Sequence, residues 1–421
     1  MTSRSEAPPA PDYSPRQILT ALVHPAVIVG ALGYFVDIYD LVLFGVVRVA
    51  SLKDLGLTGD QITTEGTWLI NVQMGGMLLG GLLWGLLGDR FGRLKILFGS
   101  IILYSLANLA NGCIHDLSGY TVCRFLAGVG LAGELGGGIT LVTEILPRTL
   151  RGYGTMMVSA IGVLGAVLAG TVGLIFAWRH MYFLGGSLGL VLLFLRLAVS
   201  ESGLYQAMAG TNRPTFASQL VLLAAPRRLG RYLCCGLIGL PCWYVIGLLI
   251  LFSPEFGKAL GATAPIVAGK ALAYAYTGIC LGDVASNLLS QFARARKSVL
   301  LAFLVATFVL INVFFILRDP TPETVYAIIF LVGIAVGYWS VFVTIAAEHF
   351  GTNVRATVAT TVPNFTRGAV IPITSLYLYL KPHFGIIPGA LTIGYLSLAL
   401  ALIGWFGLRE TFHDDLDYLE K

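Results

Sequence analysis

Long apolar runs separated by short polar gaps make up most of the sequence between residues 23 and 408. A helix needs about 20 predominantly apolar residues to cross the hydrocarbon core of a membrane. Twelve runs meet this requirement, so the pattern predicts an all-α, polytopic membrane protein with twelve transmembrane helices. The predicted spans are 23–50, 66–88, 94–113, 118–146, 152–176, 179–199, 231–253, 264–291, 298–317, 322–349, 354–380 and 384–408.

The polar positions divide these spans into two sets of six. The longest gap, 200–230, is polar and basic and follows the sixth span. Spans four and ten also repeat a pattern of residues at a constant offset of 204 positions. Two duplicated six-helix bundles around a central site are typical of secondary transporters that work by alternating access. The matching pairs are Glu134 and Tyr338, Thr140 and Thr344, Glu144 and Glu348, and Arg151 and Arg355.

Composition agrees with a membrane protein and excludes several other classes. Of the 421 residues, 56% are hydrophobic and only 12% are charged, and the mean hydropathy is +0.81. Soluble domains carry about 25% charged residues, so a cytosolic enzyme, a disordered chain and a disulfide scaffold are excluded. The six cysteines show no metal-binding spacing and suit small core residues. We expect no enzyme activity, no cofactor and no bound metal.

Lysine and arginine predict how the chain is oriented. Of its 27 basic residues, seventeen lie in or beside the gaps on one side, six lie in or beside the gaps on the other, and four lie deeper in the spans. The six are Arg48, Lys53, Arg179, Lys258, Arg318 and Lys381. The positive-inside rule places the seventeen, and both termini, in the cytoplasm, and we expect a bacterial inner membrane. The net charge of +5 therefore indicates topology rather than nucleic-acid binding. The expected units are a disordered cytoplasmic tail at 1–20, bundles at 21–199 and 231–408, a cytoplasmic loop at 200–230 and a cytoplasmic tail at 409–421.

Acidic residues inside the first half are candidates for proton coupling. Ionisable side chains at membrane depth are costly unless they have a partner, and they usually have a function. Asp37 and Asp40 lie mid-span, three residues apart and so on one helical face. Glu134 lies in span four, ten residues after Arg124. A carboxyl group in such a cluster can carry a proton near neutral pH. A purely structural ion pair between Asp40 and Arg124 is the alternative.

Bases and aromatic residues in the second half are candidates for substrate binding. Arg367 lies mid-span and offers a planar fork to a carboxylate or phosphate. Lys270 could assist it, or could instead extend toward the outer surface. Of two adjacent aromatic residues, only one can face the cavity, and core packing is the alternative for each. The aromatic candidates are Tyr39, Trp243, Tyr274, Tyr338 and Trp339.

One loop carries a family resemblance. The sequence Gly85-Leu-Leu-Gly88-Asp89-Arg90-Phe-Gly92-Arg93 between spans two and three resembles the signature loop of the major facilitator superfamily. An aspartate near a helix C-terminus is disfavoured by the macrodipole and needs outside partners, which suits a gate. The second copy, 286–297, keeps its basic residues but has lost the acid and glycines. The predicted gating residues are Gly85, Asp89, Arg90, Gly92, Arg93, Glu144, Arg151, Asp283, Glu348 and Arg355.

Two further stretches resemble one branch of this superfamily. Gly33-Tyr-Phe-Val-Asp37-Ile-Tyr39-Asp40 and the segment from Arg124 to Glu134 look like proton symporters for organic acids, sugar acids and phosphate. Span five lacks the Gly-Pro pair common in antiporters, which favours symport. Matches to a dinucleotide-binding pattern at 128–133 and to a nucleophile elbow at 185–189 lie inside apolar helices, so neither indicates its usual function.

The sequence therefore predicts a proton-coupled symporter for a small organic anion, such as a carboxylate, a sugar acid or a phosphorylated metabolite. Its partners would be the substrate, protons and the lipid bilayer, and we expect a monomer that binds no nucleic acid. One alternative is a proton antiporter that exports a cationic drug, an amine or a divalent metal, with the acidic residues as cation ligands. A nutrient sensor on the same scaffold is a third possibility, which no long soluble appendage supports.

Overall fold

The computed structural model describes residues 22–91, 93–133, 151–200, 215–412 and 420, and these residues form helices and connecting turns without a strand. The first half begins with two long helices. Local signals set several ends: Asp116, for example, caps α5 by accepting a hydrogen bond from the Gly119 amide at 2.5 Å. The helices are α2 Pro25–Asp54, α3 Asp60–Phe91, α4 Arg93–Asn111, α5 Leu117–Leu131, α7 Arg151–Val172 and α8 Trp178–Ser200.

The second half contains shorter and more interrupted helices. The helix α10 begins with a proline at its first position, inside the predicted 200–230 loop, and the short helix α9 also lies in that loop. The elements are α9 Phe216–Leu223, α10 Pro226–Leu237, α11 Leu240–Tyr244, the π-helix η2 Val245–Ile250, α12 Ser253–Ala259, α13 Ala268–Ala293, α14 Lys297–Ile316, α15 Pro322–Val336, α16 Trp339–Glu348, α17 Thr352–Gly368, α18 Val370–Phe384 and α19 Ile386–Gly407.

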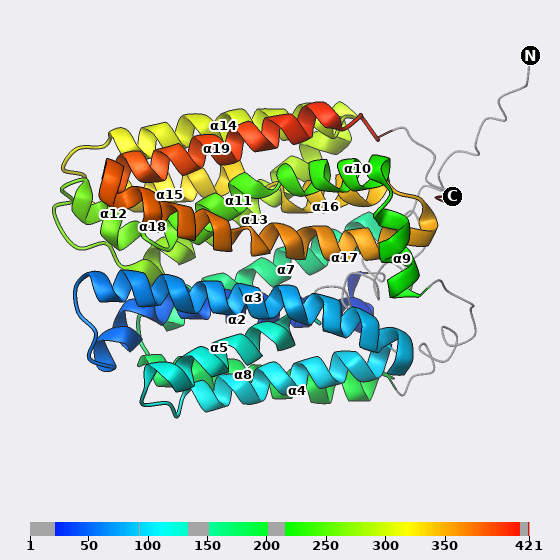
Figure 1. Cartoon of the computed structure of the whole chain (residues 1–421), viewed down its shortest axis with the longest axis horizontal. Coiled ribbons are helices and arrows are strands. Elements are labelled where there is room, and N and C mark those ends of the chain that lie inside the picture. Colours follow the sequence, from blue (N-terminus) through cyan, green and yellow to red (C-terminus); the bar gives the residue numbers. More distant parts are fainter. Residues whose placement is uncertain (1–21, 92, 134–150, 201–214, 413–419, 421) are drawn as a thin grey trace, which may run out of the picture.

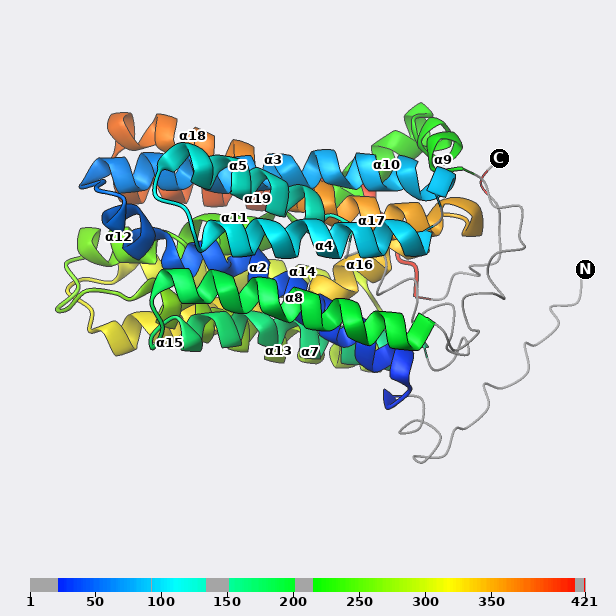
Figure 2. The ribbon, with the colours of Figure 1, turned by 90° about the horizontal axis from the view of Figure 1, so that it is seen from below.

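The helices form two bundles that lie side by side (Figures 1 and 2). In the first bundle, α2 packs on α7 and α8, and α5 packs on α3 and α4. In the second, α15 packs on α13 and α14, and α19 packs on α10 and α18. Every predicted span overlaps at least one of these helices. The twelve-span, two-bundle prediction of the fold is confirmed.

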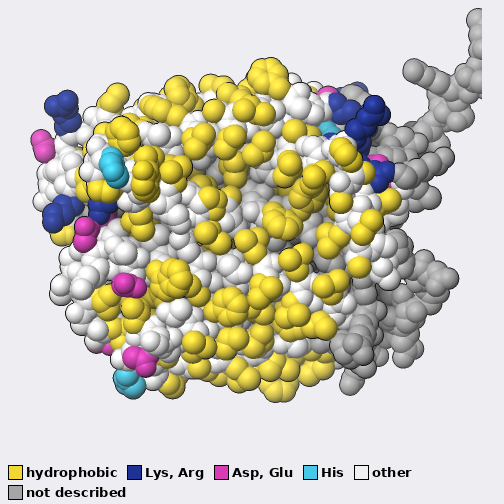
Figure 3. Space-filling view, in the orientation of Figure 1, with side chains coloured by type: hydrophobic (Ala, Val, Ile, Leu, Met, Phe, Trp, Pro, Cys, Tyr) yellow, Lys and Arg dark blue, Asp and Glu magenta, His cyan; other side chains and the backbone are white. Residues whose placement is uncertain are grey.

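The outside of the molecule suits a bilayer. Apolar side chains cover the middle of the visible face, and the charged side chains gather at its two ends (Figure 3). Five described segments, one of them α15 and α16 taken together, are long and apolar enough to cross a membrane, and the α10–η2 segment, bent by 41°, is a sixth. Other helices, such as α3 and α13, carry more glycine and polar residues because they line the contact between the bundles.

Small residues bring helices together closely. The backbone of α13 at Gly282 lies so near α15 that an added Cβ would approach the Ile334 carbonyl oxygen to 2.2 Å. At the contact between the bundles, a Cβ on Gly170 of α7 would lie 2.6 Å from the Gly269 carbonyl oxygen of α13. Without glycine at these positions the helices could not pack at this distance.

Among the described residues, helix interruptions are concentrated in the second bundle. The helix α10 gives way to α11 just before Pro241, and the backbone widens into a π-helix over η2. The tenth predicted span is divided by Gly337 into α15 and α16. The eleventh is divided at Ala369, close to Pro372, whose ring nitrogen has no hydrogen to donate to the preceding turn. Interrupted helices at membrane depth are tolerated where they line a cavity.

The two bundles are tied together at the end that holds the α2–α3 connection, residues 55–59. The buried Arg48 of α2 contacts Glu255 of α12 at 2.7 Å and donates to the Leu251 carbonyl oxygen at 3.1 Å. Its guanidinium also lies 4.5 Å from the centre of the Phe252 ring. A second cross-bundle ion pair, between Lys381 and Asp60, measures 2.7 Å. Two ion pairs therefore hold the bundles together at this end.

Candidate functional site

A buried ion pair joins the two bundles near the middle of the molecule. Arg367, on α17, donates from Nη1 to Oδ2 of Asp37, on α2, at 3.4 Å, and both side chains are at most 1% exposed. Asp37 Oδ1 and Arg367 Nε have no hydrogen-bond partner among the described residues. Two residues that the sequence assigned to different tasks, proton coupling and substrate binding, are thus in direct contact.

Aromatic rings surround the guanidinium of this pair. Arg367 lies 5.8 Å from the ring centre of Trp243 and 6.0 Å from that of Trp339, and the two indoles meet edge to face. Such contacts stabilise a cation away from water. The hydroxyl groups of Tyr34 and Tyr276 lie within electrostatic range of both Asp37 and Arg367. The cluster therefore combines one cation, one anion and several rings.

The second acid, Asp40, faces the interior of the first bundle. Its carboxylate rests against Gly185 of α8, where an added Cβ would lie only 2.5 Å from it. Neither of its oxygens has a hydrogen-bond partner among the described residues, and Arg124, Asp37 and Asn108 are the polar groups whose electrostatic influence reaches it. Arg124 donates to Asn108 Oδ1 at 2.6 Å. Asp40 and Arg124 therefore share one buried polar region without forming a direct ion pair.

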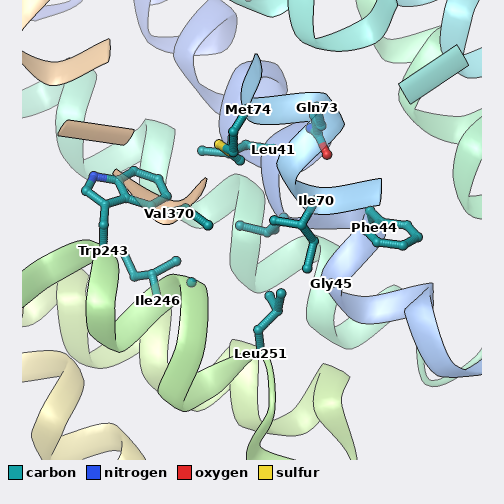
Figure 4. A pocket seen from close by; sticks show the side chains of 12 residues that line it. Leu41, Phe44, Gly45, Ile70, Gln73, Met74, Trp243, Ile246, Leu251 and Val370 are labelled. Atoms are coloured by element: carbon teal, nitrogen blue, oxygen red, sulfur yellow. The ribbon is translucent and has the colours of Figure 1, made fainter. Parts of the chain in front are cut away.

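A small cavity lies between the bundles beside this region (Figure 4). Its volume is about 30 Å³, room for a water molecule but far below the roughly 300 Å³ of a typical ligand pocket. The residues around it are apolar except for two side chains with polar atoms, Gln73 and Trp243. The lining residues are Leu41, Val42, Phe44, Gly45, Ile70, Gln73, Met74, Trp243, Ile246, Gly247, Leu251 and Val370.

A third buried acid, Asp283 of α13, lies where the tenth span is interrupted. Its Oδ1 accepts from the Ser340 amide at 2.7 Å, in the first turn of α16, where the helix dipole favours a negative charge. Its Oδ2 accepts from the hydroxyl groups of Ser340 at 2.5 Å and of Ser159, on α7, at 2.7 Å. Asp283 thus connects the interrupted helix to the opposite bundle.

Two aromatic candidates face away from the ion pair. Tyr39 is fully buried inside the first bundle and donates to the Met181 carbonyl oxygen at 3.0 Å. Tyr338 is fully buried inside the second and donates to the Ile238 carbonyl oxygen at 3.0 Å. Because Tyr338 and Trp339 are adjacent, only Trp339 reaches the ion pair.

Two other candidates lie at the surface. Tyr274 is 48% exposed and stacks on Tyr326 at 5.5 Å, whereas Tyr276, two residues on and on the opposite side of α13, is buried near the ion pair. Lys270, in the first turn of α13, is exposed. The structure therefore does not bring Lys270 or Tyr274 together with Arg367, and Tyr276 is an aromatic neighbour of the pair that the sequence-based choice missed.

The predicted gating residues are only partly described. Glu348, at the end of α16, pairs with Arg296 at 3.3 Å and accepts from the Thr411 hydroxyl at 2.7 Å. Arg355 donates to the carbonyl oxygens of Ala347 and Phe350. The helix α3 ends at Phe91, so Asp89 does lie in its last turn, as predicted. Three of the predicted gating or coupling residues, Gly92, Glu134 and Glu144, lie outside the described residues. For Gly85, Asp89, Arg90, Arg93 and Arg151, the structure describes only the helical backbone.

Comparison with known proteins identifies the family. The profile of the Major Facilitator Superfamily matches residues 30–375. The chain belongs to this superfamily. The crystal structure of a D-xylose-proton symporter, only 15% identical, covers 92% of this chain and 98% of its own with a TM-score of 0.68, so the two share their fold.

Relatives of this superfamily member are transporters rather than enzymes. A probable 4-methylmuconolactone transporter of Cupriavidus pinatubonensis is 26% identical over 90% of this chain and 89% of its own. The niacin transporter NiaP of Acinetobacter baylyi is 31% identical, but the match covers 37% of this chain and 35% of that protein. The chain is thus a multi-pass membrane transporter of the Major Facilitator Superfamily. Neither of the two matches by itself identifies the compound that this chain transports.

Proposed function

We propose that this protein is a symporter that carries a small organic anion together with a proton. The observation that carries the proposal is the buried Asp37–Arg367 ion pair between the bundles. Protonation of Asp37 would release the guanidinium of Arg367, which could then hold the carboxylate of the substrate in place of Asp37. Binding and proton uptake would in this way depend on one contact.

The balance of buried charges supports a fixed ratio. Among the charges nearest the Asp37–Arg367 pair, Asp37 and Asp40 contribute two negative charges, and Arg124 and Arg367 contribute two positive charges. Asp283 is counted apart, because Ser340 and Ser159 already donate three hydrogen bonds to its carboxylate. A single carboxylate would leave one excess negative charge away from water, which is strongly disfavoured. One proton removes that excess, so one anion would enter with one proton. Glu134 is a further proposed proton carrier.

The surroundings of Arg367 favour an anion with a small apolar ring. Trp243 and Trp339 lie beside the guanidinium, and the wall of the neighbouring cavity is almost entirely apolar. Niacin, a pyridine carboxylate, and 4-methylmuconolactone, a ring carboxylate, are the compounds named for two relatives. We therefore take a small ring-bearing carboxylate as the substrate class.

The rest of the cycle follows from the two bundles. We infer that the bundles, 21–199 and 231–408, rock about the central site to expose it alternately, with the cytoplasmic gate at the predicted loop residues. The termini would lie in the cytoplasm and the chain in the bacterial inner membrane, as a monomer. Asp283, which connects α13, α16 and α7, would act in the gate between the bundles.

Binding of nicotinate and benzoate to the purified protein in detergent tests this proposal, by calorimetry at about pH 6 and about pH 8. We expect the dissociation constant to rise about tenfold per pH unit where one proton is taken up with the anion. Arg367→Ala should abolish binding. Asp37→Asn should retain binding but lose its pH dependence, because no acid then competes for Arg367.

Asp54→Asn is the matched control, because Asp54 is an exposed acid at the end of the same helix. It should leave affinity and pH dependence unchanged. Wild-type affinity in Arg367→Ala, with the variant folded, would refute the role of Arg367. Binding of amines or divalent cations that strengthens at high pH and disappears in Asp37→Asn would instead establish a cation antiporter.

A further inference from the structure

The wall of the central cavity contains two hydrogen-bond donors without acceptors. Gln73 Nε2 and Trp243 Nε1 are buried and have no partner among the described residues. The two side chains belong to opposite bundles, Gln73 to α3 and Trp243 to α11, and they lie on either side of Leu41 and Met74 (Figure 4). A buried donor without an acceptor is costly, so each marks a position where an acceptor is expected.

The orientation of the Gln73 amide is determined by its neighbour. Its Oε1 accepts from Arg124 Nη1 at 3.5 Å. A guanidinium has only donors, so the amide oxygen must be the end that faces Arg124. The amide nitrogen is then directed away from Arg124, and Gln73 is 1% exposed, so water outside the protein does not satisfy it.

Trp243 belongs to the other end of the site. Its ring lies beside Arg367, the group to which the carboxylate of the substrate is assigned. The side chains between Trp243 and Gln73 are apolar. The site thus offers a cation with an indole N–H at one end, an apolar middle, and an amide N–H at the other end.

From this arrangement we propose that Gln73 determines specificity by donating a hydrogen bond to a second acceptor on the substrate, at the opposite end of the molecule from its carboxylate. The inference rests on the proposed function, because it assumes that Arg367 holds a carboxylate. The ligand is a small ring with two polar ends: a carboxylate and a ring nitrogen, carbonyl or hydroxyl oxygen. Niacin and 4-methylmuconolactone, named for two relatives, both have two such ends.

Matched probes test the proposal. Benzoate has a carboxylate but no second acceptor, and nicotinate and isonicotinate differ from it only by a nitrogen in place of a ring C–H. The hydroxybenzoates place a hydroxyl oxygen at the corresponding positions. Calorimetry on the full-length protein in detergent should show that at least one of these compounds binds about tenfold more tightly than benzoate.

Substitution of Gln73 should remove that preference. In Gln73→Met, which has nearly the same shape, the preferred probe and benzoate should bind with equal affinity. Gln73→Leu, which also lacks the donor, gives the same comparison if the methionine variant does not fold. The control is Asn71→Leu, because Asn71 is an amide on the same helix that bonds Ser375 and Thr374 and lies outside the cavity wall.

The outcomes separate the two proposals. If wild-type protein binds benzoate as tightly as every two-ended probe, or if Gln73→Met keeps the preference, the role of Gln73 is refuted and the anion symporter stands. If no carboxylate binds the wild type, the proposed function fails and the role of Gln73 fails with it. Loss of the preference in Asn71→Leu would also refute the assignment, because the effect would then belong to the helix rather than to Gln73.

Discussion

Glu410 shows how one side chain can organise an end of the second bundle. It lies just after α19, and its carboxylate accepts from the amides of Arg296 and Lys297, at the start of α14, at 2.8 and 2.9 Å. It also accepts from the amides of Thr411 and Phe412. Partial burial alone would raise its pKa, but the four amide hydrogen bonds outweigh burial and lower the pKa below the ordinary value.

Glu410→Gln should therefore destabilise the protein in a pH-dependent way. A carboxylate with a lowered pKa stabilises the fold above its ordinary pKa of about 4.5, and that contribution is lost as the pH falls through the folded value. We expect a loss of about 1 kcal/mol near neutral pH, typical of a helix cap, and none once the acid is protonated. Unfolding in detergent near pH 7 and near pH 4 measures this difference.

Glu323→Gln is the control for that measurement, because Glu323 is an exposed acid in the first turn of α15. It should change stability by only a few tenths of a kcal/mol at either pH. A destabilisation by Glu410→Gln that is equally large near pH 4 would contradict the electrostatic explanation.

At the residue scale, the hydropathy pattern identifies charged residues at membrane depth as functional candidates, but it does not predict where their side chains point. Asp37 and Arg367 stood out because charges are costly at membrane depth, and both belong to the site. Their direct contact could not be predicted, because it joins helices 330 residues apart. Gln73 was missed because a neutral amide in an apolar span carries no comparable signal.

The same limit explains two aromatic choices. Tyr274 and Tyr276 are the same residue type in the same predicted span, so the sequence does not distinguish them. Their positions differ because of how α13 is rotated against its neighbours. A shift of two residues on a helix turns a side chain by about 200°. That rotation is set by packing, which the sequence of one helix does not determine.

Close helix packing at the element scale gives a sharp test. Gly282→Ala should destabilise the protein by about 1–3 kcal/mol, because the added methyl group would meet the Ile334 carbonyl of α15, which cannot move alone. Gly75→Ala, in α3, is the matched control, since nothing lies within 4 Å of its added Cβ. It should be neutral or stabilising by up to about 1 kcal/mol, because alanine favours a helix. Thermal unfolding in detergent compares the two, and equal destabilisation would refute the packing argument.

The interruption between α15 and α16 shows what hydropathy cannot predict about an element. Residues 322–349 were predicted as one span because the apolar run continues through Gly337. At the break, Asp283 from another helix accepts a hydrogen bond from the Ser340 amide at the start of α16. Hydropathy therefore predicts the position of a long span. It does not predict an interruption inside the span, where a side chain from another helix bonds the backbone.

On the scale of the whole molecule, the two-bundle fold could be predicted almost completely. Apolar runs and the offset repeat gave the number and grouping of helices, because the membrane allows few other arrangements. The repeat did not reveal the interruptions that the described part of the second bundle contains. Nor did it reveal the ion pair between Arg48 and Glu255, because Arg48 was counted simply as one of the outer basic residues.

The pairing of one proton with one anion at Asp37 and Arg367 has an energetic consequence. A complete cycle would move a charge of minus one and a charge of plus one in the same direction, so no net current would flow. The membrane voltage, worth about 2.3 kcal/mol per charge per 100 mV, would then do no work on transport. Accumulation would depend on the pH difference alone, with a limit of about tenfold per pH unit. Vesicles given a potassium-diffusion potential at equal pH should accumulate no substrate, and accumulation there would refute the one-to-one ratio.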